Sequence, residues 1–229
     1  MKKVCYYLIT GTCLIFLLAP FKLSAQTAKW DTTSRAKYYA EKLLKFKSDP
    51  ISEQDFVFLG NSITAGTNWA TLLDLPIAKN RGISGDITFG VLERLSEIIE
   101  ANPRKIFILI GINDISKGIP DSLILRNYKR MISRIQKGSK SKIYFNTLLP
   151  VNNTMNTTNK HREKDEQITW LNKEIRKLAS KRVTVIDLYP HFIDAENRLK
   201  ESLTYDGLHL NAAGYEEWAK LLKAGNYLK

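Results

Sequence analysis

The chain has 229 residues, 44% of them hydrophobic, and a formal net charge of +12. A chain of this length can bury a core large enough for one domain without disulfide bonds. The lysines and arginines are spread through stretches of helical pattern such as residues 126–142. We therefore interpret the charge as a solvated basic surface and expect no nucleic-acid partner.

Residues 1–25 have the pattern of a secretory signal peptide. Two lysines precede an apolar run at 8–19, and the small residues of LSAQ (23–26) favour cleavage after Ala25. The alternative is a retained membrane anchor, but the apolar run is short for a span and Pro20 interrupts it. We expect an exported protein with no stable membrane insertion after cleavage.

Both cysteines of the chain, Cys5 and Cys13, lie in this predicted signal peptide. A lipid anchor on Cys13 is disfavoured because the preceding TGT lacks the usual aliphatic residue. The mature chain, from about residue 26, then has no thiol, which excludes disulfide bonds, a cysteine nucleophile and cysteine metal ligands. Cleavage also lowers the net charge from +12 to +9.

Residues 26–229 are predicted to form one domain, which begins with an amphipathic helix over about 30–48. Tyr39, Leu43 and Phe46 have helical spacing in that segment. Strand and helix patterns then alternate. The predicted strands cover residues 56–60, 77–83, 105–112, 142–150 and 183–190, and the predicted helices cover residues 62–73, 88–101, 120–138, 163–180 and 212–225.

The strand segments are apolar without polar alternation, which is typical of strands that are covered on both faces. Alternating strands and helices indicate a parallel sheet with right-handed crossovers. The predicted fold is α/β, a three-layer α/β/α sandwich with a five-stranded parallel sheet.

Polar residues and glycines follow the predicted strands. The segments concerned are GNS (60–62), NRGISGD (80–86), GINDI (111–115), LPVNN (149–153) and, before the last helix, YDGLHLNAAGY (205–215). The carboxyl ends of parallel strands lie along one edge of the sheet, where ligands bind in α/β folds. These segments bring together a serine, asparagines, an aspartate, a histidine and glycine-rich backbone, the groups that acyl transfer requires.

Ser62 and His209 are the candidate nucleophile and base. His209 lies three residues after Asp206, so the carboxylate can hold the imidazole while the other ring nitrogen faces Ser62. Of the other two histidines, His161 has no acid at this spacing. His191 has Asp194 three residues after it, in the opposite order, and we interpret that pair as structural or as part of the surface. Taken alone, Ser62 could instead cap the helix that follows it, and Asp206 could cap a turn.

The sequence gives no support for metal or cofactor chemistry. It has no His-x-x-x-His pattern and no clustered carboxylates, and the glycines of GISGD do not match phosphate-loop or dinucleotide spacing. We expect neither a metal nor a cofactor.

Four short blocks in chain order resemble the signature blocks of the SGNH/GDSL hydrolases. They are GNSIT (60–64), NRGISGD (80–86), GIND (111–114) and DGLH (206–209). They are most similar to the subgroup related to platelet-activating-factor acetylhydrolase catalytic subunits and bacterial sialate and carbohydrate O-acetylesterases. The resemblance covers residues 52–225 and implies the flavodoxin-like fold of that family. From the predicted signal peptide we expect a periplasmic or secreted location, and we suspect a bacterial source.

The resemblance also implies a role for each matching residue. Ser62 would be the nucleophile and His209 the base, with Asp206 orienting the ring. The backbone N–H groups of Ser62 and Gly85 and the side-chain amide of Asn113 would bind the oxyanion.

The sequence departs from the family pattern at Asn61, which stands where the family has aspartate. We expect altered local hydrogen bonding there and retained activity. Candidate substrate contacts are Asn61, Trp69, Asn152 and Asn153, although core packing for Trp69 and a plain polar loop for residues 152–156 explain the sequence equally well.

The expected function is that of an exported serine esterase acting on a small acylated substrate, an acetyl ester of a carbohydrate or a similar alcohol. One alternative is a lysophospholipase or thioesterase for longer acyl chains. Another is a non-catalytic carbohydrate-binding relative that keeps the fold.

Overall fold

The computed structural model describes residues 1, 30–33, 35–155 and 159–229. Apart from Met1, the signal peptide predicted for residues 1–25 lies outside the described residues. None of the helices in the described ranges is long and apolar enough to cross a membrane.

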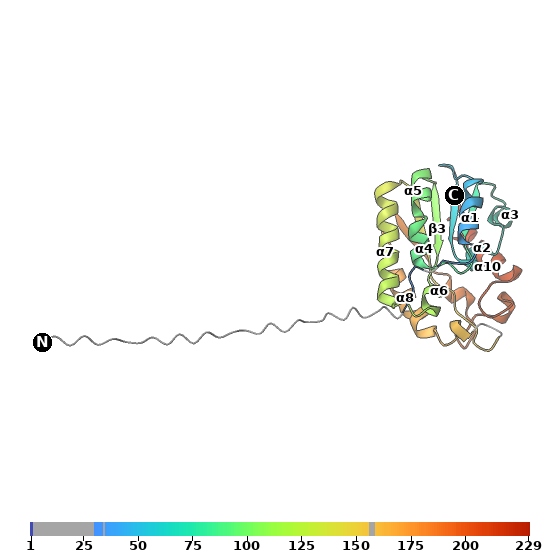
Figure 1. Cartoon of the computed structure of the whole chain (residues 1–229). Helices are drawn as coiled ribbons and strands as arrows, with labels where there is room; N and C mark the ends of the chain where they lie inside the picture. The colour runs from blue at the N-terminus through green and yellow to red at the C-terminus, as the bar shows by residue number, and fades with distance from the viewer. Residues whose placement is uncertain (2–29, 34, 156–158) are drawn as a thin grey trace.

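Five parallel strands form one sheet in the order β2-β1-β3-β4-β5. The strands are β1 (Phe56–Gly60), β2 (Ala78–Gly82), β3 (Lys105–Leu109), β4 (Lys142–Asn146) and β5 (Val183–Ile186). Helices lie on both sides of the sheet (Figure 1). The predicted three-layer fold with five parallel strands is therefore confirmed.

The helices of the described chain divide between the two faces and one edge of the sheet. They are α1 (Tyr39–Lys47), α2 (Ser62–Ala65), α3 (Trp69–Leu73), α4 (Thr88–Glu93), α5 (Leu95–Ala101), α6 (Ile112–Ser116), α7 (Asp121–Gly138), α8 (Asp165–Arg176), α9 (Tyr189–Phe192) and α10 (Ala212–Ala224), with short 3₁₀ helices η1 (Asn159–His161) and η2 (Glu201–Leu203). Helices α4, α5, α7 and α8 pack together on one face, and α3 contacts α10 on the other (Figure 1).

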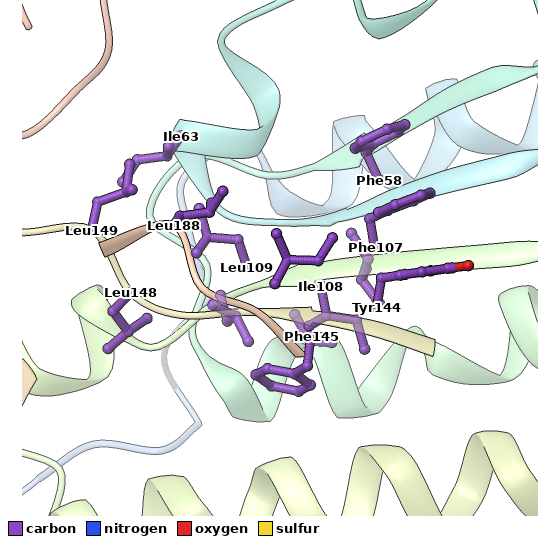
Figure 2. Packing of buried hydrophobic residues seen from close by; sticks show 14 of the residues in the cluster. Phe58, Ile63, Phe107, Ile108, Leu109, Tyr144, Phe145, Leu148, Leu149 and Leu188 are labelled. Atoms are coloured by element: carbon purple, nitrogen blue, oxygen red, sulfur yellow. The ribbon is translucent and has the colours of Figure 1, made fainter. Parts of the chain in front are cut away.

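Stacked aromatic rings join three strands to helix α3. Phe58 on β1 lies 4.1 Å from Trp69 and 4.7 Å from Phe107 on β3, measured between ring centroids. Phe107 in turn stacks on Tyr144 of β4 at 4.7 Å (Figure 2). Because these rings come from adjacent strands, their stacking helps to hold the strands in register and also fills the core.

Several predicted elements are shorter than expected or divided. The first helix begins at Tyr39 rather than near residue 30. The helix predicted over 62–73 is two helices, because Asn68 accepts a hydrogen bond from the Thr71 N–H and starts a new helix at Trp69. The helix predicted over 88–101 is likewise divided at Arg94.

The strand predicted over 105–112 ends at Leu109. Gly111, with φ +137°, turns the chain into helix α6, so Asn113 lies on a helical turn rather than at the end of a strand. The strands predicted to end at residues 150 and 190 end at Asn146 and Ile186. Residues 110–112 and 147–150 are buried, which explains why the apolar pattern continues past the sheet there, whereas beyond β5 only Leu188 of residues 187–190 is buried.

Candidate active site

Ser62 is the first residue of helix α2, two residues after strand β1 ends. The residue that caps this helix is Asn61, whose Oδ1 accepts a hydrogen bond of 3.0 Å from the Ile63 N–H. Capping by Asn61 leaves the Ser62 hydroxyl available at the carboxyl edge of the sheet, where its side chain is half-buried. The structure thus removes the alternative in which Ser62 serves as the cap.

A line of hydrogen bonds joins Ser62, His209 and Asp206. The Oγ of Ser62 lies 2.9 Å from Nε2 of His209, and Nδ1 of the same ring lies 2.7 Å from Oδ2 of Asp206. The two nitrogens of one imidazole therefore face a hydroxyl on one side and a carboxylate on the other, as the DGLH spacing predicts.

The Asp206 carboxylate is held in its charged form. Its Oδ1 accepts the backbone N–H groups of Leu208 at 2.9 Å and His209 at 2.7 Å. Burial alone would raise the pKa of Asp206, but the hydrogen bonds from the His209 ring and from these two N–H groups lower the pKa below its ordinary value. The carboxylate can therefore orient the ring and stabilise a positive charge on it.

The loop that carries His209 is fastened to the loop after β4. Gly207 has φ +86°, and its carbonyl accepts the Asn152 N–H at 2.7 Å. A Cβ on Gly207 would lie 2.5 Å from the Asn152 carbonyl oxygen, so this close approach requires glycine.

The three groups predicted to bind an oxyanion come from three different segments of this edge. Gly85 lies in an exposed turn with φ +79°, and Asn113 lies on α6. The Asn113 amide nitrogen donates to the Asp86 carbonyl at 2.9 Å, which holds α6 against the Gly85 turn. Among the described residues, no acceptor is bonded to the backbone N–H of Ser62 or Gly85.

Strand order explains why these segments meet. In the order β2-β1-β3-β4-β5 the chain leaves β1 toward one edge and returns to β3 on the other side of β1. In α/β folds, ligands bind at the carboxyl ends of the strands where such a reversal occurs. Ser62 follows β1 and Asn113 follows β3, so both lie at this point of the sheet edge.

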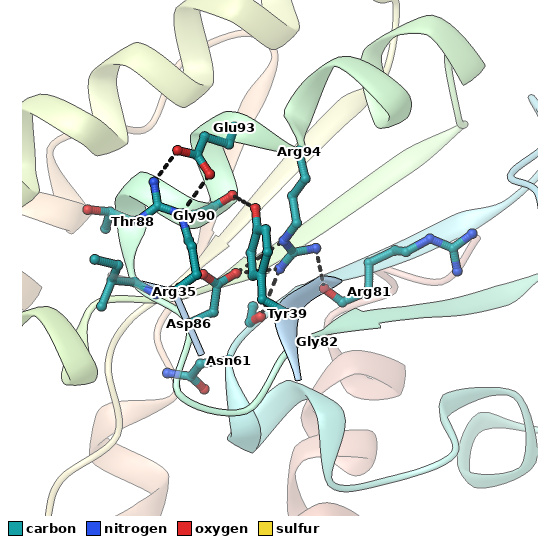
Figure 3. Close-up of polar contacts among 12 residues, drawn as sticks. Arg35, Tyr39, Asn61, Arg81, Gly82, Asp86, Thr88, Gly90, Glu93 and Arg94 are labelled. Carbon is teal, nitrogen blue, oxygen red and sulfur yellow. Dashed lines mark hydrogen bonds and ion pairs between the residues drawn. The ribbon is translucent and has the colours of Figure 1, made fainter. Parts of the chain in front are cut away.

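A buried ion pair supports the Gly85 turn. Arg94 Nη2 lies 2.9 Å from Asp86 Oδ2, and the same guanidinium donates to the carbonyls of Gly60 at 3.1 Å and Arg81 at 2.8 Å (Figure 3). One side chain thus joins the ends of β1 and β2 to the turn. The sequence analysis did not identify Arg94, because a single arginine within a helical pattern gives no signal of burial.

A second buried carboxylate, Asp114, fastens α6 to the start of α4. It accepts the Thr88 N–H at 3.0 Å and the Thr88 hydroxyl at 2.5 Å. Asn127 of α7 donates to the same hydroxyl at 2.8 Å. Burial raises the pKa of Asp114 to about 7, although the hydrogen bonds from Thr88 oppose that rise.

The structure places three of the four candidate substrate contacts in internal roles. Asn61 is the buried helix cap, and Trp69 is fully buried with its indole N–H bonded to the Thr64 carbonyl. The buried Asn152 donates to the Leu199 carbonyl at 2.9 Å. All three side chains are therefore buried and bonded within the protein.

The fourth candidate, Asn153, is half-buried. Its side chain bonds to the Asp165 carboxylate at 3.1 Å and to the Glu163 N–H at 3.2 Å. Both of its side-chain polar atoms therefore have protein partners.

Two side chains beside the site were not identified from the sequence. His161 Nε2 lies 3.3 Å from Asn113 Oδ1. The Tyr205 ring is stacked on the His209 ring at 5.8 Å between centroids and 9° between planes, and Tyr205 is 66% exposed. The available signal for Tyr205 was its position directly before the DGLH block. The sequence contains no corresponding signal for His161, whose contact with Asn113 joins two separate segments of the chain.

Comparison with known proteins agrees with this arrangement. Residues 58–217 match the family model described as GDSL-like lipase/acylhydrolase. A Streptococcus pneumoniae protein provisionally named a platelet activating factor is 30% identical, with a TM-score of 0.74 over 84% of this chain and 92% of that protein.

Two esterases are more distant relatives. An acetyl xylan esterase structure is 26% identical, with a TM-score of 0.61 over 75% of this chain and 98% of the esterase. An arylesterase of Vibrio mimicus is 28% identical over 116 residues, which are 44% of this chain and 58% of the arylesterase. The family match covers well over half of the chain, and its limits enclose all four sequence blocks around the site. The chain belongs to the GDSL-like lipase/acylhydrolase family.

Proposed function

We propose that the protein is an exported serine esterase that hydrolyses small acyl esters, acetyl esters in particular, of carbohydrates or similar alcohols. The observation that carries this proposal is the hydrogen-bonded line from Asp206 through His209 to Ser62. Membership of an acylhydrolase family supports the reaction class. The pattern of residues 1–25 supports export to the periplasm or beyond the cell.

In the acylation half-reaction, the Ser62 oxygen attacks the ester carbonyl carbon while Nε2 of His209 takes the hydroxyl proton. The carbonyl oxygen becomes an oxyanion near the N–H groups of Ser62 and Gly85 and the Asn113 amide. Collapse of the tetrahedral intermediate breaks the bond to the alcohol, and His209 gives its proton to the leaving oxygen. The acyl group remains on Ser62.

Water completes the cycle. His209 takes a proton from a water molecule, whose oxygen attacks the acyl carbon through a second oxyanion held by the same donors. Collapse returns the proton to the Ser62 oxygen and releases the carboxylic acid. The Asp206 carboxylate stabilises the imidazolium form of His209 in both halves, and no cofactor takes part in any step.

The alcohol half of the ester would lie beside His209, because that ring protonates the leaving oxygen. The exposed Tyr205 ring covers one side of His209 and offers a flat surface to an alcohol that contains a ring. The acetyl xylan esterase relative gives independent support for an acetylated sugar. The close spacing of the sequence blocks, with no apolar insertion that would line a long acyl channel, favours a small acyl group.

The test of the nucleophile is Ser62→Ala, assayed on an aryl acetate and labelled with a serine-directed phosphonate. We expect loss of turnover and of labelling with an unchanged melting temperature. Ser96→Ala, at an exposed position of α5, is the control and should behave as wild type. Activity of Ser62→Ala within tenfold of wild type would exclude this nucleophile, and a folded wild type that neither labels nor turns over would favour a non-catalytic carbohydrate-binding protein.

A series of aryl esters from acetyl to octanoyl tests the acyl preference. We expect kcat/KM to be highest for acetyl and to fall with chain length. A steady rise toward octanoyl would instead identify a lysophospholipase or thioesterase for longer chains. Acetate release from a panel of acetylated sugars would then identify the alcohol.

A further inference from the structure

The side-chain amide of Asn113 is held at both ends. Its nitrogen donates one hydrogen to the Asp86 carbonyl at 2.9 Å, and its oxygen lies 3.3 Å from Nε2 of His161. An amide nitrogen carries two hydrogens, so one N–H remains after the bond to Asp86. From these contacts we propose that His161 is a positioning residue that fixes the orientation of the Asn113 amide as an oxyanion donor. The proposal rests on the esterase function proposed above.

The direction of the contact determines the form of His161. The Asn113 oxygen is a carbonyl and can only accept, so Nε2 of His161 must carry the hydrogen. Rotating the amide by half a turn would bring its oxygen against the Asp86 carbonyl and its N–H groups against the N–H of His161. The contact with the Asp86 carbonyl would then be repulsive, and so would the contact with His161 as long as Nε2 carries the hydrogen. Asp86 and this form of His161 together disfavour the reversed amide.

The surroundings of His161 favour a neutral ring. Burial and the neighbouring His209 lower the pKa of His161, with Lys160 and Lys164 acting in the same direction and Asp206 opposing them. A neutral ring also avoids repulsion with the imidazolium that His209 forms during each half-reaction.

The fold places His161 at this position through η1. This short helix packs against α6, which carries Asn113. The half-buried ring thus reaches the Asn113 side chain, with Nε2 at 3.3 Å from Oδ1. No contact of His161 with Ser62, His209 or Asp206 is needed for this role, which distinguishes His161 from the residues of the proton relay.

A double-mutant cycle on an aryl acetate tests the proposal. Asn113→Ala should lower kcat by about 100- to 1,000-fold, as removal of one oxyanion donor does. His161→Phe keeps an aromatic ring at this position but removes the hydrogen-bond donor. We expect kcat to fall by about tenfold, which is less than the loss expected on removal of the whole Asn113 amide, with little change in KM. In the Asn113→Ala background, His161→Phe should have no further effect.

Two further variants separate positioning from bulk structure. His161→Gln places an amide N–H near the position of Nε2 and should restore most of the lost kcat. His161→Ala adds no bulk, and its kcat should match that of His161→Phe. Agreement between the two variants would show that the loss does not come from misfolding caused by the larger phenylalanine side chain. His191→Phe, at an exposed histidine of α9, should leave kcat unchanged.

The proposal would be overturned if the fold-losses in kcat of the two single variants, His161→Phe and Asn113→Ala, multiply in the double variant. It would also be overturned if His161→Phe and His161→Ala both keep the wild-type kcat. An unchanged kcat in Asn113→Ala would also overturn it, because there would be no donor to position. Phosphonate labelling rates follow the same cycle where turnover is too slow to measure. Since loss of the Ser62 nucleophile is tested separately by Ser62→Ala, failure of this inference and failure of the proposed function are distinguishable.

Discussion

At the scale of single residues, Asn61 and Ser62 divide two tasks that one residue could have combined. Serine and asparagine are both good helix caps. Here the Asn61 side chain caps α2, and the Ser62 hydroxyl is bonded to His209 instead. A neutral amide performs this capping without placing a charge beside the nucleophile, which explains how asparagine can replace the aspartate that gives the family its name.

Tyr205 is the residue with which we test the alcohol half of the substrate. Removing its ring in Tyr205→Ala should lower kcat/KM for an acetylated sugar about fivefold, the loss of about 1 kcal/mol from one aromatic contact. An ester of a small alcohol such as methyl acetate should be little affected, and Tyr205→Phe should keep the wild-type preference. The ratio of kcat/KM for the two esters is the measurement.

The exposed Tyr38 provides the control, because Tyr38→Ala removes a similar ring far along the sequence from the site blocks. An equal loss on both esters in Tyr205→Ala would show that Tyr205 supports the His209 ring and does not contact the alcohol.

Sequence reasoning was effective for residues whose partners lie within the same motif. The Asp206–His209 contact follows from a spacing of three, and the contact with Ser62 follows from both segments lying at the carboxyl edge of the sheet. His161 and Tyr205 could not be identified in this way. Their contacts depend on how two loops fold over the edge, and periodicity contains no information about that.

At the scale of elements, the position of Ser62 depends on close packing between helix α2 and strand β2. A Cβ on Gly82, the last residue of β2, would lie 2.3 Å from the Ala65 backbone nitrogen and 2.8 Å from the Thr64 carbonyl carbon. Backbone atoms cannot move aside as a flexible side chain can. Glycine at this position therefore allows α2 to lie directly against the strand end.

Gly82→Ala should displace α2 and with it Ser62. We expect a loss of about 1–3 kcal/mol in the free energy of unfolding, as in other overpacked sites, together with a lower kcat. Gly138→Ala is the matched control, since its Cβ would meet only the Ile99 side chain, 2.5 Å from Cγ2. Chemical denaturation and aryl acetate assays of both variants measure the effect. A Gly82→Ala enzyme with wild-type kcat would show that α2 can shift without moving the nucleophile.

Element boundaries show where sequence patterns lose information. Residues 88–101 have one continuous helical pattern, yet the helix divides at Arg94, whose guanidinium bonds to the Gly60 and Arg81 carbonyls. Residues 110–112 are apolar and buried but lie beyond the sheet. The periodicity of apolar residues indicates which side chains are buried, but it does not indicate which element of the fold buries them.

At the scale of the whole molecule, the fold class could be predicted because five apolar strands alternate with helices. The local patterns do not give the order of the strands, since nothing in them states that β1 lies between β2 and β3. The order was implied only by the family resemblance, through its flavodoxin-like fold, and it determines where the site lies because it brings the ends of β1 and β3 together. The general position of the site therefore follows from the fold class, and its particular set of donors follows from the strand order.

The buried Asp114 links the stability of the whole fold to pH. In the unfolded chain its carboxyl has an ordinary pKa, whereas burial in the folded protein raises that pKa to about 7. The folded state thus binds a proton more tightly than the unfolded state. Asp114 contributes most to stability at low pH, and the contribution is lost as pH rises from about 4 to about 7. Asp114→Asn keeps an acceptor for Thr88 and removes this titration.

We therefore expect the melting temperature of Asp114→Asn, minus that of wild type, to increase between about pH 4 and about pH 7 and to level off at higher pH. Taking the difference at each pH removes the effect of the other carboxylates, including Asp206, whose lowered pKa acts in the opposite direction. Asp74→Asn, at an exposed position in left-handed conformation that asparagine also tolerates, should give a difference that is independent of pH. A difference for Asp114→Asn that is flat or falls with pH would mean that the buried carboxylate stays ionised in the fold. Thr88 and the start of α4 would then stabilise its charge more strongly than burial opposes it.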